Sequence, residues 1–327
     1  MSSFLEKTIE RARVANKHIV LPEGSDARTW EAAAAALAQK VARITVLATA
    51  DEVPAGFDTA GVSVVDPKTA DFKDELAASL FELRAAKGMT REQADELIVD
   101  PLYFGIMMVK EGLADGAVAG AVNATSAVLR AALQILKTAP GTKLVSSYFI
   151  MDVPDCEYGA GGVFLFSDCG LVENPDAEML SEIAISSAGS FEALVAARAQ
   201  VAMLSYSTYG SASSPLTEKV VEATRLAQEK RPDIALDGEL QLDAAIVEAI
   251  GKSKAPDSKV AGKANVLIFP DLNSGNIAYK LTERLAKAEA YGPITQGIGG
   301  PVNDLSRGCS ADDILGVIAI TAVQAAA

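Results

Sequence analysis

Segments typical of strands and segments typical of helices alternate along most of this 327-residue chain. Short runs rich in Val, Ile and Leu, such as HIVLPE at 18–23, are each followed by an Ala-rich or amphipathic stretch. The predicted strands are 18–23, 42–48, 62–67, 116–122, 199–207, 233–240 and 264–271, with 42–48 and 62–67 buried. The predicted helices are 26–40 (capped by Asp26), 73–88 (ended by Gly88), 101–113, 125–138 and 274–290, with others after Pro175, Pro215 and Gln241. This alternation predicts an α/β protein with parallel strands joined by helical crossovers.

The alternation is interrupted once. KLVSSYFIMDVP at 143–154 and GGVFLFSDC at 161–169 form two consecutive strand-like runs with a turn between them, which predicts an antiparallel pair. We therefore predict a change of domain near residue 146. After YGPITQG at 291–297 the chain has one loop and one helix, too little for a domain, so we expect it to return to the first domain. The predicted domains are 1–146 with about 297–327, and 147–296.

Composition and charge limit the class of function. Half of the residues are hydrophobic but only 6% are aromatic, which indicates a globular core of Ala, Val, Ile and Leu rather than a disordered chain. The net charge of −14 argues against nucleic acid as a partner. The longest apolar runs are too short to span a bilayer, and the first seventeen residues carry too many charges for a signal peptide. We expect a soluble, cytoplasmic protein that does not bind membranes.

The sequence lacks the residues that several kinds of catalytic site require. The three cysteines form no CxxC pair, and His18 is the only histidine, so Ser-His-Asp triads and His-rich zinc sites are not expected. We interpret His18, at the start of a strand, as structural. The sequence has no GxxxxGK[ST] loop and no complete GxGxxG fingerprint. The chemistry must then come from carboxylates, hydroxyls, guanidinium groups or backbone, without a bound metal.

Arg130 follows a segment that is typical of an anion site. A strand, a loop of small residues and the start of a helix at Thr125 and Ser126 offer free N–H groups and a positive helix end, and Arg130 adds a forked donor. The alternative is a surface arginine on a helix that Thr125 or Ser126 caps. Arg84, near a predicted helix end, carries a weaker signal of the same kind.

The segment PVNDLSRGCSADDI at 301–314 contains a second concentration of polar residues. Ser310 and Asp313 fit the [ST]-x-x-[DE] capping box, in which the serine caps the helix and the acid reaches back. Capping requires nothing of Ser306, Arg307 or Cys309. These three residues are therefore candidates for a reaction centre.

The chain resembles the phosphate acetyltransferase (phosphotransacetylase) family. YGPITQG followed by PVNDLSRGCSADDI is similar to the C-terminal signature of that family. Other segments are similar to further family blocks in the same order: VLPEGSDART, FELRAAKGMT, LADGAVAGAVNATSAVLRAALQILKT, FLFSDC, DGELQLDAA and NVLIFPDLNSGNIAYKL. Together the blocks cover most of the chain.

The resemblance implies a fold and a reaction. The fold is similar to that of the isocitrate and isopropylmalate dehydrogenases, with two α/β domains and the active site in the cleft between them. The reaction is reversible acetyl transfer between acetyl phosphate and coenzyme A, giving acetyl-CoA and inorganic phosphate. Coenzyme A is then a substrate and no cofactor is needed. Family members are commonly homodimers.

By motif, the resemblance assigns roles to individual residues. Asp313 is the base that takes the thiol proton, Ser306 bonds the thiol or carbonyl region, and Arg307 stabilises charge on acetyl phosphate. Arg84 and Arg130 hold phosphate, at the helix that begins with Thr125 and Ser126, and Lys280 and Tyr291 contact coenzyme A. Two alternatives stay open: a phosphate butyryltransferase, and a non-catalytic regulatory module that senses acyl-CoA.

Overall fold

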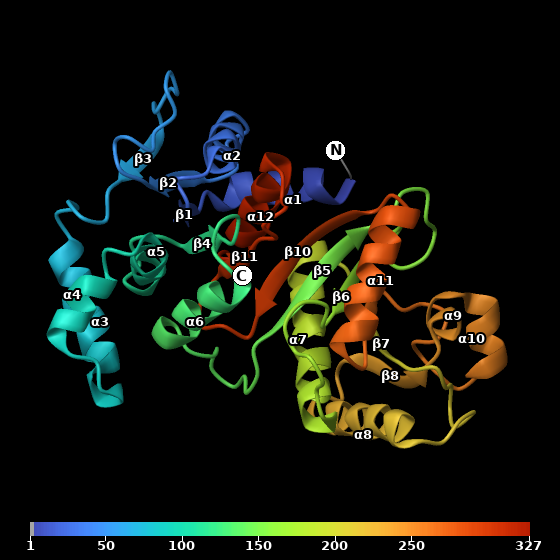
Figure 1. The fold of residues 1–327 in the computed structure, drawn as a ribbon. Coiled ribbons are helices and arrows are strands. Elements are labelled where there is room, and N and C mark those ends of the chain that lie inside the picture. Colours follow the sequence, from blue (N-terminus) through green and yellow to red (C-terminus); the bar gives the residue numbers. More distant parts are fainter. Residues whose placement is uncertain (1–2) are drawn as a thin grey trace. The chain divides into compact units, whose positions relative to one another are not determined.

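The computed structural model describes residues 3–327, so Met1 and Ser2 of the predicted first domain lie outside the described part. Contacts between Cα atoms divide the chain into two compact units. The first unit comprises Ser3–Pro140 and Ile298–Ala327, and the second comprises Gly141–Gly297. In Figure 1 the blue-to-green start of the chain and its last red segment, 298–327, make up the first unit.

The first unit is built on a five-stranded parallel sheet with the order β11-β4-β1-β2-β3. Its strands are β1 (His18–Leu21), β2 (Arg43–Leu47), β3 (Val62–Val65), β4 (Gly116–Ala119) and β11 (Val302–Asp304). Its helices are α1 (Ser3–Ala15), α2 (Ala27–Ala38), α3 (Lys73–Arg84), α4 (Arg91–Leu97), α5 (Pro101–Lys110), α6 (Thr125–Ile135) and α12 (Ala311–Gln324), with a 3-10 turn at Ala85–Lys87. The predicted parallel α/β arrangement is confirmed here.

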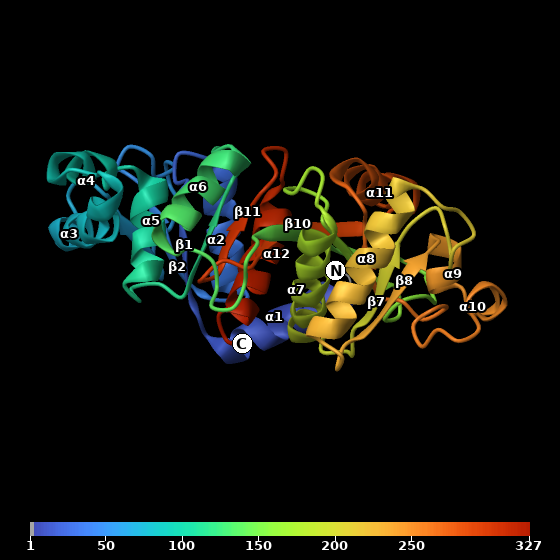
Figure 2. The same cartoon turned by 90° about the horizontal axis from the view of Figure 1, so that it is seen from below.

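Helices cover the sheet of the first unit. Helix α12 is apolar nearly all round and packs on α1, α2, β1 and β4, whereas α5 packs on β1 and β4 from the opposite side (Figures 1 and 2). Because both faces of β1 and β4 are covered, nearly all of their side chains are buried, as expected for the centre of a parallel sheet.

The second unit is built on a six-stranded mixed sheet with the order β10-β5-β6-β9-β7-β8. Its strands are β5 (Ser146–Asp152), β6 (Val163–Ser167), β7 (Gln200–Leu204), β8 (Ala235–Leu240), β9 (Val266–Ile268) and β10 (Glu289–Gln296). Its helices are α7 (Ala177–Val195), α8 (Pro215–Lys230), α9 (Leu242–Ile246), α10 (Glu248–Lys254) and α11 (Leu272–Leu285). Strands β5 and β6 form the predicted antiparallel pair. A cluster of buried residues that includes Phe149, Phe164 and Phe166 lies in the core of the second unit.

The structure corrects the sequence prediction in several places. Strand β10 (Glu289–Gln296), for which no strand is predicted, pairs antiparallel with β5, and α11 ends at Leu285 instead of 290. The C-terminal stretch contains the short strand β11 as well as a helix. Strand β3 is mostly exposed, because it lies at the sheet edge. Helices α1 and α4 were not predicted.

No helix within residues 3–327 is long and apolar enough to cross a membrane.

Candidate active site

Three loops of the first unit follow neighbouring parallel strands. Strands β1, β4 and β11 lie side by side, so the loops after Leu21, Ala119 and Asp304 leave the sheet at the same edge. In open α/β sheets, ligands bind at the carboxyl ends of the strands. The predicted residues Thr125, Ser126, Ser306 and Arg307 all belong to these loops or to the helix starts that follow them.

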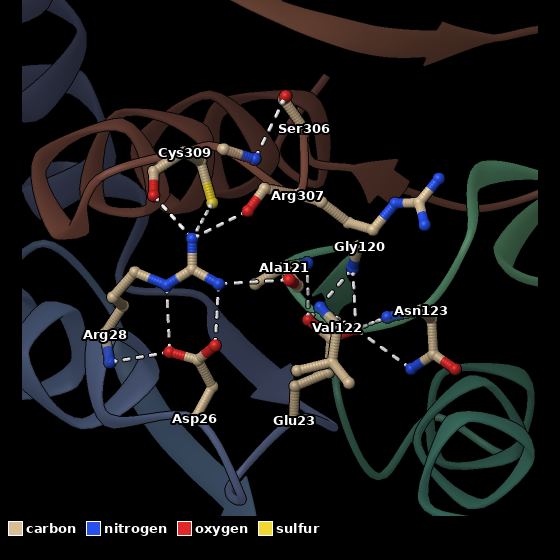
Figure 3. Close-up of polar contacts among 11 residues, drawn as sticks. Glu23, Asp26, Arg28, Gly120, Ala121, Val122, Asn123, Ser306, Arg307 and Cys309 are labelled. Carbon is tan, nitrogen blue, oxygen red and sulfur yellow. Dashed lines mark hydrogen bonds and ion pairs between the residues drawn. The ribbon is translucent and has the colours of Figure 1, made fainter.

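The loop after β4 is organised around Glu23, which follows β1. The Glu23 side chain is buried, and its carboxylate accepts hydrogen bonds from the backbone N–H groups of Gly120, Ala121, Val122 and Asn123 at 2.8–3.2 Å. The Asn123 side-chain amide donates a further bond at 2.9 Å. Figure 3 shows these N–H groups converging on the carboxylate. The loop is thus shaped like an anion site, but a carboxylate of the protein itself fills it.

Arg28 connects the same loop to the one after β11. Its guanidinium binds the Asp26 carboxylate at 2.6 and 2.9 Å, and this hydrogen bonding lowers the pKa of Asp26. It also donates to three backbone carbonyls: Ala121 at 3.0 Å, Arg307 at 3.0 Å and Cys309 at 2.7 Å (Figure 3). One planar side chain therefore fixes the two loops in register, which a single point charge could not do.

The loop at 305–310 presents two of the predicted residues to solvent. Ser306 and Arg307 are exposed, and the Ser306 hydroxyl accepts only a weak bond from the Gly308 N–H at 3.3 Å. The Arg307 guanidinium extends away from Arg28 (Figure 3) and has no hydrogen bond or ion pair among residues 3–327. Because the loop backbone is held while these side chains are free, the arrangement suits binding of an anionic ligand.

Helix α12 begins with the predicted capping box. The Ser310 hydroxyl accepts from the Asp313 N–H at 3.1 Å, and the Asp313 carboxylate accepts from the Ser310 N–H and hydroxyl, both at 2.8 Å. This part of the sequence prediction is confirmed. The bonds use one carboxylate oxygen, Oδ2, and the side chain is exposed, so Asp313 can both cap the helix and meet a substrate.

The start of α6 differs from the prediction. Its N-cap is Ala124, which has no side-chain bond, so the alternative in which Thr125 or Ser126 caps the helix is wrong. The Thr125 hydroxyl instead donates to Asp304 at 2.6 Å. The loop N–H groups expected to be free are taken by Glu23, which leaves the first turn of the helix itself as the positive end. Ser126 is exposed there.

The structure brings Arg84 and Arg130 together. They come from α3 and α6, and both line a cavity of about 600 Å³. Lys87, Tyr103 and Gln134 also line this cavity, and the Tyr103 hydroxyl donates to Gln134 at 3.0 Å. The Arg84 Nε atom is buried with no hydrogen-bond partner in the described structure. The cavity is lined by three cations against one carboxylate, Glu96, so together with the unpaired buried donor it favours an anionic ligand.

Lys280 and Tyr291 belong to the second unit, and neither lines the 450 Å³ cavity described there. The Lys280 ammonium is exposed on α11, donates to Asn276 and Tyr279, and lies 4.4 Å from the centre of the Tyr279 ring. The Tyr291 side chain is buried in β10, and its hydroxyl donates to Glu289. Lys280 is accessible to a ligand, whereas Tyr291 offers little surface.

The remaining titratable candidates are structural. Burial raises the pKa of the Cys309 thiol, which Arg28 partly offsets, so the thiolate is disfavoured. His18 hydrogen-bonds Thr45 at 2.8 Å, and burial lowers its pKa, in keeping with the structural interpretation. Within residues 3–327, no group of three His, Cys, Asp or Glu side chains is arranged to hold a metal ion.

Glu23 and Arg28 are functional residues that the sequence patterns do not indicate. Their partners lie about 100 and 280 positions further along the chain, which no local pattern can indicate. A signal was nevertheless present, because EGSDAR at 23–28 places three charged residues directly after a buried strand and ahead of a helix. Such a concentration exceeds what a single N-cap requires.

The chain is similar to known proteins over nearly its whole length. Residues 3–322 match the family model described as phosphate acetyl/butaryl transferase. The chain is 63% identical over 326 residues to a protein of Acetivibrio thermocellus named phosphate acetyltransferase, and the alignment covers 99% of this chain and 98% of that protein. It superposes on a phosphotransacetylase from Streptococcus pyogenes with a TM-score of 0.91 and 43% identity, covering 99% of this chain and 98% of the other.

A more distant likeness concerns the fold alone. A 4-hydroxythreonine-4-phosphate dehydrogenase from Klebsiella pneumoniae superposes with a TM-score of 0.57 and 11% identity, over 95% of this chain and all of the other. The predicted dehydrogenase-like two-domain fold is thereby confirmed. The match to the family model and the relatives' identity over nearly full length lead to one conclusion: this chain belongs to the phosphate acetyl/butaryl transferase family.

Proposed function

We propose that the protein is a phosphate acetyltransferase, which moves an acetyl group reversibly between acetyl phosphate and coenzyme A. The observation that carries this proposal is the loop at 305–310, where Ser306 and Arg307 are free in front of the exposed Asp313 while Arg28 holds the loop backbone. The names of the relatives support the same activity.

The transfer is direct in this scheme. The sulfur of coenzyme A attacks the acetyl carbonyl carbon, the C–S bond forms, and the C–O bond to phosphate breaks to release inorganic phosphate. The thiol proton passes to the Asp313 carboxylate. Ser306 hydrogen-bonds the thiol or carbonyl region, and Arg307 stabilises negative charge on the phosphate oxygens.

Proton transfer sets a condition on this scheme. An ordinary thiol titrates about 4.6 units above an ordinary aspartate, so the transfer is uphill by about 6 kcal/mol. The free guanidinium of Arg307 offsets part of this cost, because a nearby cation stabilises the thiolate. Exclusion of water by the bound substrates strengthens this electrostatic effect.

The phosphate-binding part of the proposal rests on the 600 Å³ cavity. Arg84 and Arg130 line it, and the unpaired Nε atom of Arg84 is a donor available to a phosphate oxygen. Thr125 and Ser126, in the N-terminal turn of α6, do not line this cavity and are retained as proposed substrate contacts at the positive end of the helix. Lys280 and Tyr291 are retained as proposed contacts of coenzyme A.

A rate assay tests the function. Purified protein is mixed with coenzyme A and either acetyl or butyryl phosphate, and formation of the thioester is followed. We expect faster turnover of acetyl phosphate, with an Arg307→Ala variant as the inactive control. Butyryl phosphate as the better substrate would favour the second acyl group named for the family. No turnover of either substrate would indicate the non-catalytic, acyl-CoA-sensing alternative.

We also propose that the enzyme is a homodimer in which α11 contributes to the interface. Ile277, Leu281 and Leu285 recur every four residues on one face of α11, and their side chains are 58%, 51% and 78% exposed. Light scattering at micromolar concentration tests this. Leu281→Glu should give a monomer, whereas Leu242→Glu, which replaces another exposed leucine, should not. A monomeric parent protein would refute the proposal.

Two further proposals, the division into domains and a location in the cytoplasm, have supporting observations. The compact units 3–140 with 298–327, and 141–297, support a division into two folding domains. The three free cysteines and a thiol substrate suit the reducing environment of the cytoplasm.

A further inference from the structure

Asp304, the last residue of β11, is a buried carboxyl with few hydrogen-bond donors. Its side chain is 1% exposed. Oδ2 accepts one bond, from the Thr125 hydroxyl at 2.6 Å, and Oδ1 is buried with no hydrogen-bond partner in the described structure. A charged carboxylate in such surroundings is costly, because no donors replace its lost water.

The space beside Oδ1 is closed on the side of Gly120. Gly120 has a φ of +117°, and a Cβ atom placed there would collide with Asp304 Oδ1 and with the Leu305 backbone N. Since even a methyl group does not fit, a water molecule cannot bind on that side. The unpaired oxygen therefore cannot recover its hydration from the Gly120 side.

A second carboxylate in the same region is fully satisfied. Glu23 accepts from five N–H groups, whereas Asp304 has the Thr125 hydroxyl and only a weaker contact with the Leu305 N–H. Two carboxylates that interact cannot both ionise without cost. The negative charge belongs on Glu23, where the donors are, and the proton belongs on Asp304.

The charged groups that act on Asp304 are Glu23, from the loop after β1, and Arg307, from its own loop, while α6 contributes the Thr125 hydroxyl. Burial and Glu23 raise the pKa of Asp304 from its ordinary 3.8 to about 7, against the opposing effects of Thr125, Leu305 and Arg307. If Asp304 ionised, it would attract the nearby Arg307 guanidinium, which is the side chain that must remain free for phosphate.

We propose that Asp304 is a positioning residue that works as a neutral carboxylic acid: it anchors Thr125 at the start of α6 and leaves the Arg307 guanidinium free to bind substrate. Asp304 acts through Thr125 and Arg307, not on the reacting atoms. This role of Asp304 rests on the proposed function only in the experiment that measures activity. The infrared experiment does not depend on the proposed function.

The raised pKa of Asp304 determines how the stability of the protein depends on pH. The folded protein holds the Asp304 proton more tightly than the unfolded chain, so the contribution of this group to the free energy of unfolding falls as pH rises from about 4 to about 7. The neutral fraction falls about tenfold between pH 6 and pH 8. Asp304→Asn keeps a neutral side chain of the same shape and removes the titration.

Activity is measured for the parent and for Asp304→Asn between pH 6 and pH 8. The ratio of the variant's kcat/KM for acetyl phosphate to the parent's should rise about tenfold over this range, because only the parent loses its neutral acid. Asp71→Asn, at an exposed aspartate of the same unit, should show a constant ratio. A constant ratio for Asp304→Asn would overturn the proposed role.

A second measurement does not need activity. Infrared spectra of the parent protein labelled with ¹³C-aspartate should show a buried carboxylic acid at pH 6 that is lost as pH rises through about 7. Thr125→Val removes a bond that lowers the pKa and should shift this loss to higher pH. If no such acid is present at pH 6, Asp304 is ionised and the proposal is wrong, whether or not the protein transfers acetyl groups.

Discussion

Two neighbouring strands of the first unit, β4 and β11, are each followed by a loop and a helix. The two loops differ in how their polar groups are hydrogen-bonded and in how the following helix is capped. The loop after β4 has its backbone N–H groups saturated by Glu23, and α6 begins without a side-chain cap. The loop after β11 leaves its side chains free, and α12 begins with a complete capping box. The first loop is a fixed support, and the second offers reactive groups on a helix that is already stabilised.

The difference shows how a site can be both rigid and available. Arg28 links the two loops, because it donates hydrogen bonds to one backbone carbonyl of the β4 loop and to two backbone carbonyls of the β11 loop. The backbone that carries Ser306 and Arg307 is therefore held, while their side chains stay available. Each prediction below tests one side of this contrast.

The largest effect is expected at Asp313. Asp313→Asn keeps an oxygen for the capping box, so the free energy of unfolding should fall by no more than about 1 kcal/mol. Loss of the base should lower kcat by roughly 10²–10⁴-fold. Melting temperature and kcat are measured on the same preparation at neutral pH. If activity stays within about tenfold of the parent, Asp313 is only a cap and Asp312 becomes the next candidate.

A smaller effect is expected in the cavity of Arg84 and Arg130. Replacement of either residue by Ala removes a charge-assisted bond to phosphate and should raise KM for acetyl phosphate by about 10–100-fold. KM for coenzyme A should change much less. Arg130→Lys should restore binding only in part, since an ammonium cannot make the forked contact. Equal changes in both KM values would contradict the assignment.

The support loop is tested by Glu23→Gln. The new amide NH₂ group faces N–H donors that need an acceptor, so the free energy of unfolding should fall by about 1–3 kcal/mol. Glu31→Gln, on an exposed position of α2, serves as the control and should change stability by less than about 0.5 kcal/mol. Urea unfolding of the three proteins gives the comparison. Equal stabilities would mean that the loop does not depend on the carboxylate.

The smallest effect is expected at Cys309. Its thiol is buried and its pKa is raised, so it is a poor nucleophile, and Cys309→Ala should retain most of the activity. Initial-rate plots against the two substrates should intersect, as for direct transfer in a ternary complex. Parallel lines together with a trapped acetyl-enzyme would instead indicate a covalent intermediate.

Local features were predictable from the sequence. The caps at Asp26 and Ser310 were predicted correctly, because a cap depends on three or four adjacent residues. Strand β10 was missed, since Gly292 and Pro293 are typical of turns, and the strand accommodates them with an irregularity in its pairing between Tyr291 and Ile294.

The candidate site was less accessible to prediction. Ser306, Arg307 and Asp313 lie within one short segment, so they could be identified together. Arg84 and Arg130 could each be singled out, but only the packing of α3 and α6 shows that they share a cavity. Contacts over a hundred or more positions, such as those of Glu23, depend on the order of strands in the sheet.

The discontinuity of the first unit has a consequence during synthesis on the ribosome. Strand β11, the loop at 305–310 and α12 are translated only after all 157 residues of 141–297. At about 5–20 residues per second this takes about 8–30 s. Throughout that time β4 is paired with β1 but lacks β11 on its other side, and the faces of α1 and α2 that α12 will cover are open to chaperones. A ribosome that stalls before Asp304 therefore releases a chain that is exposed to quality control and has no reactive loop.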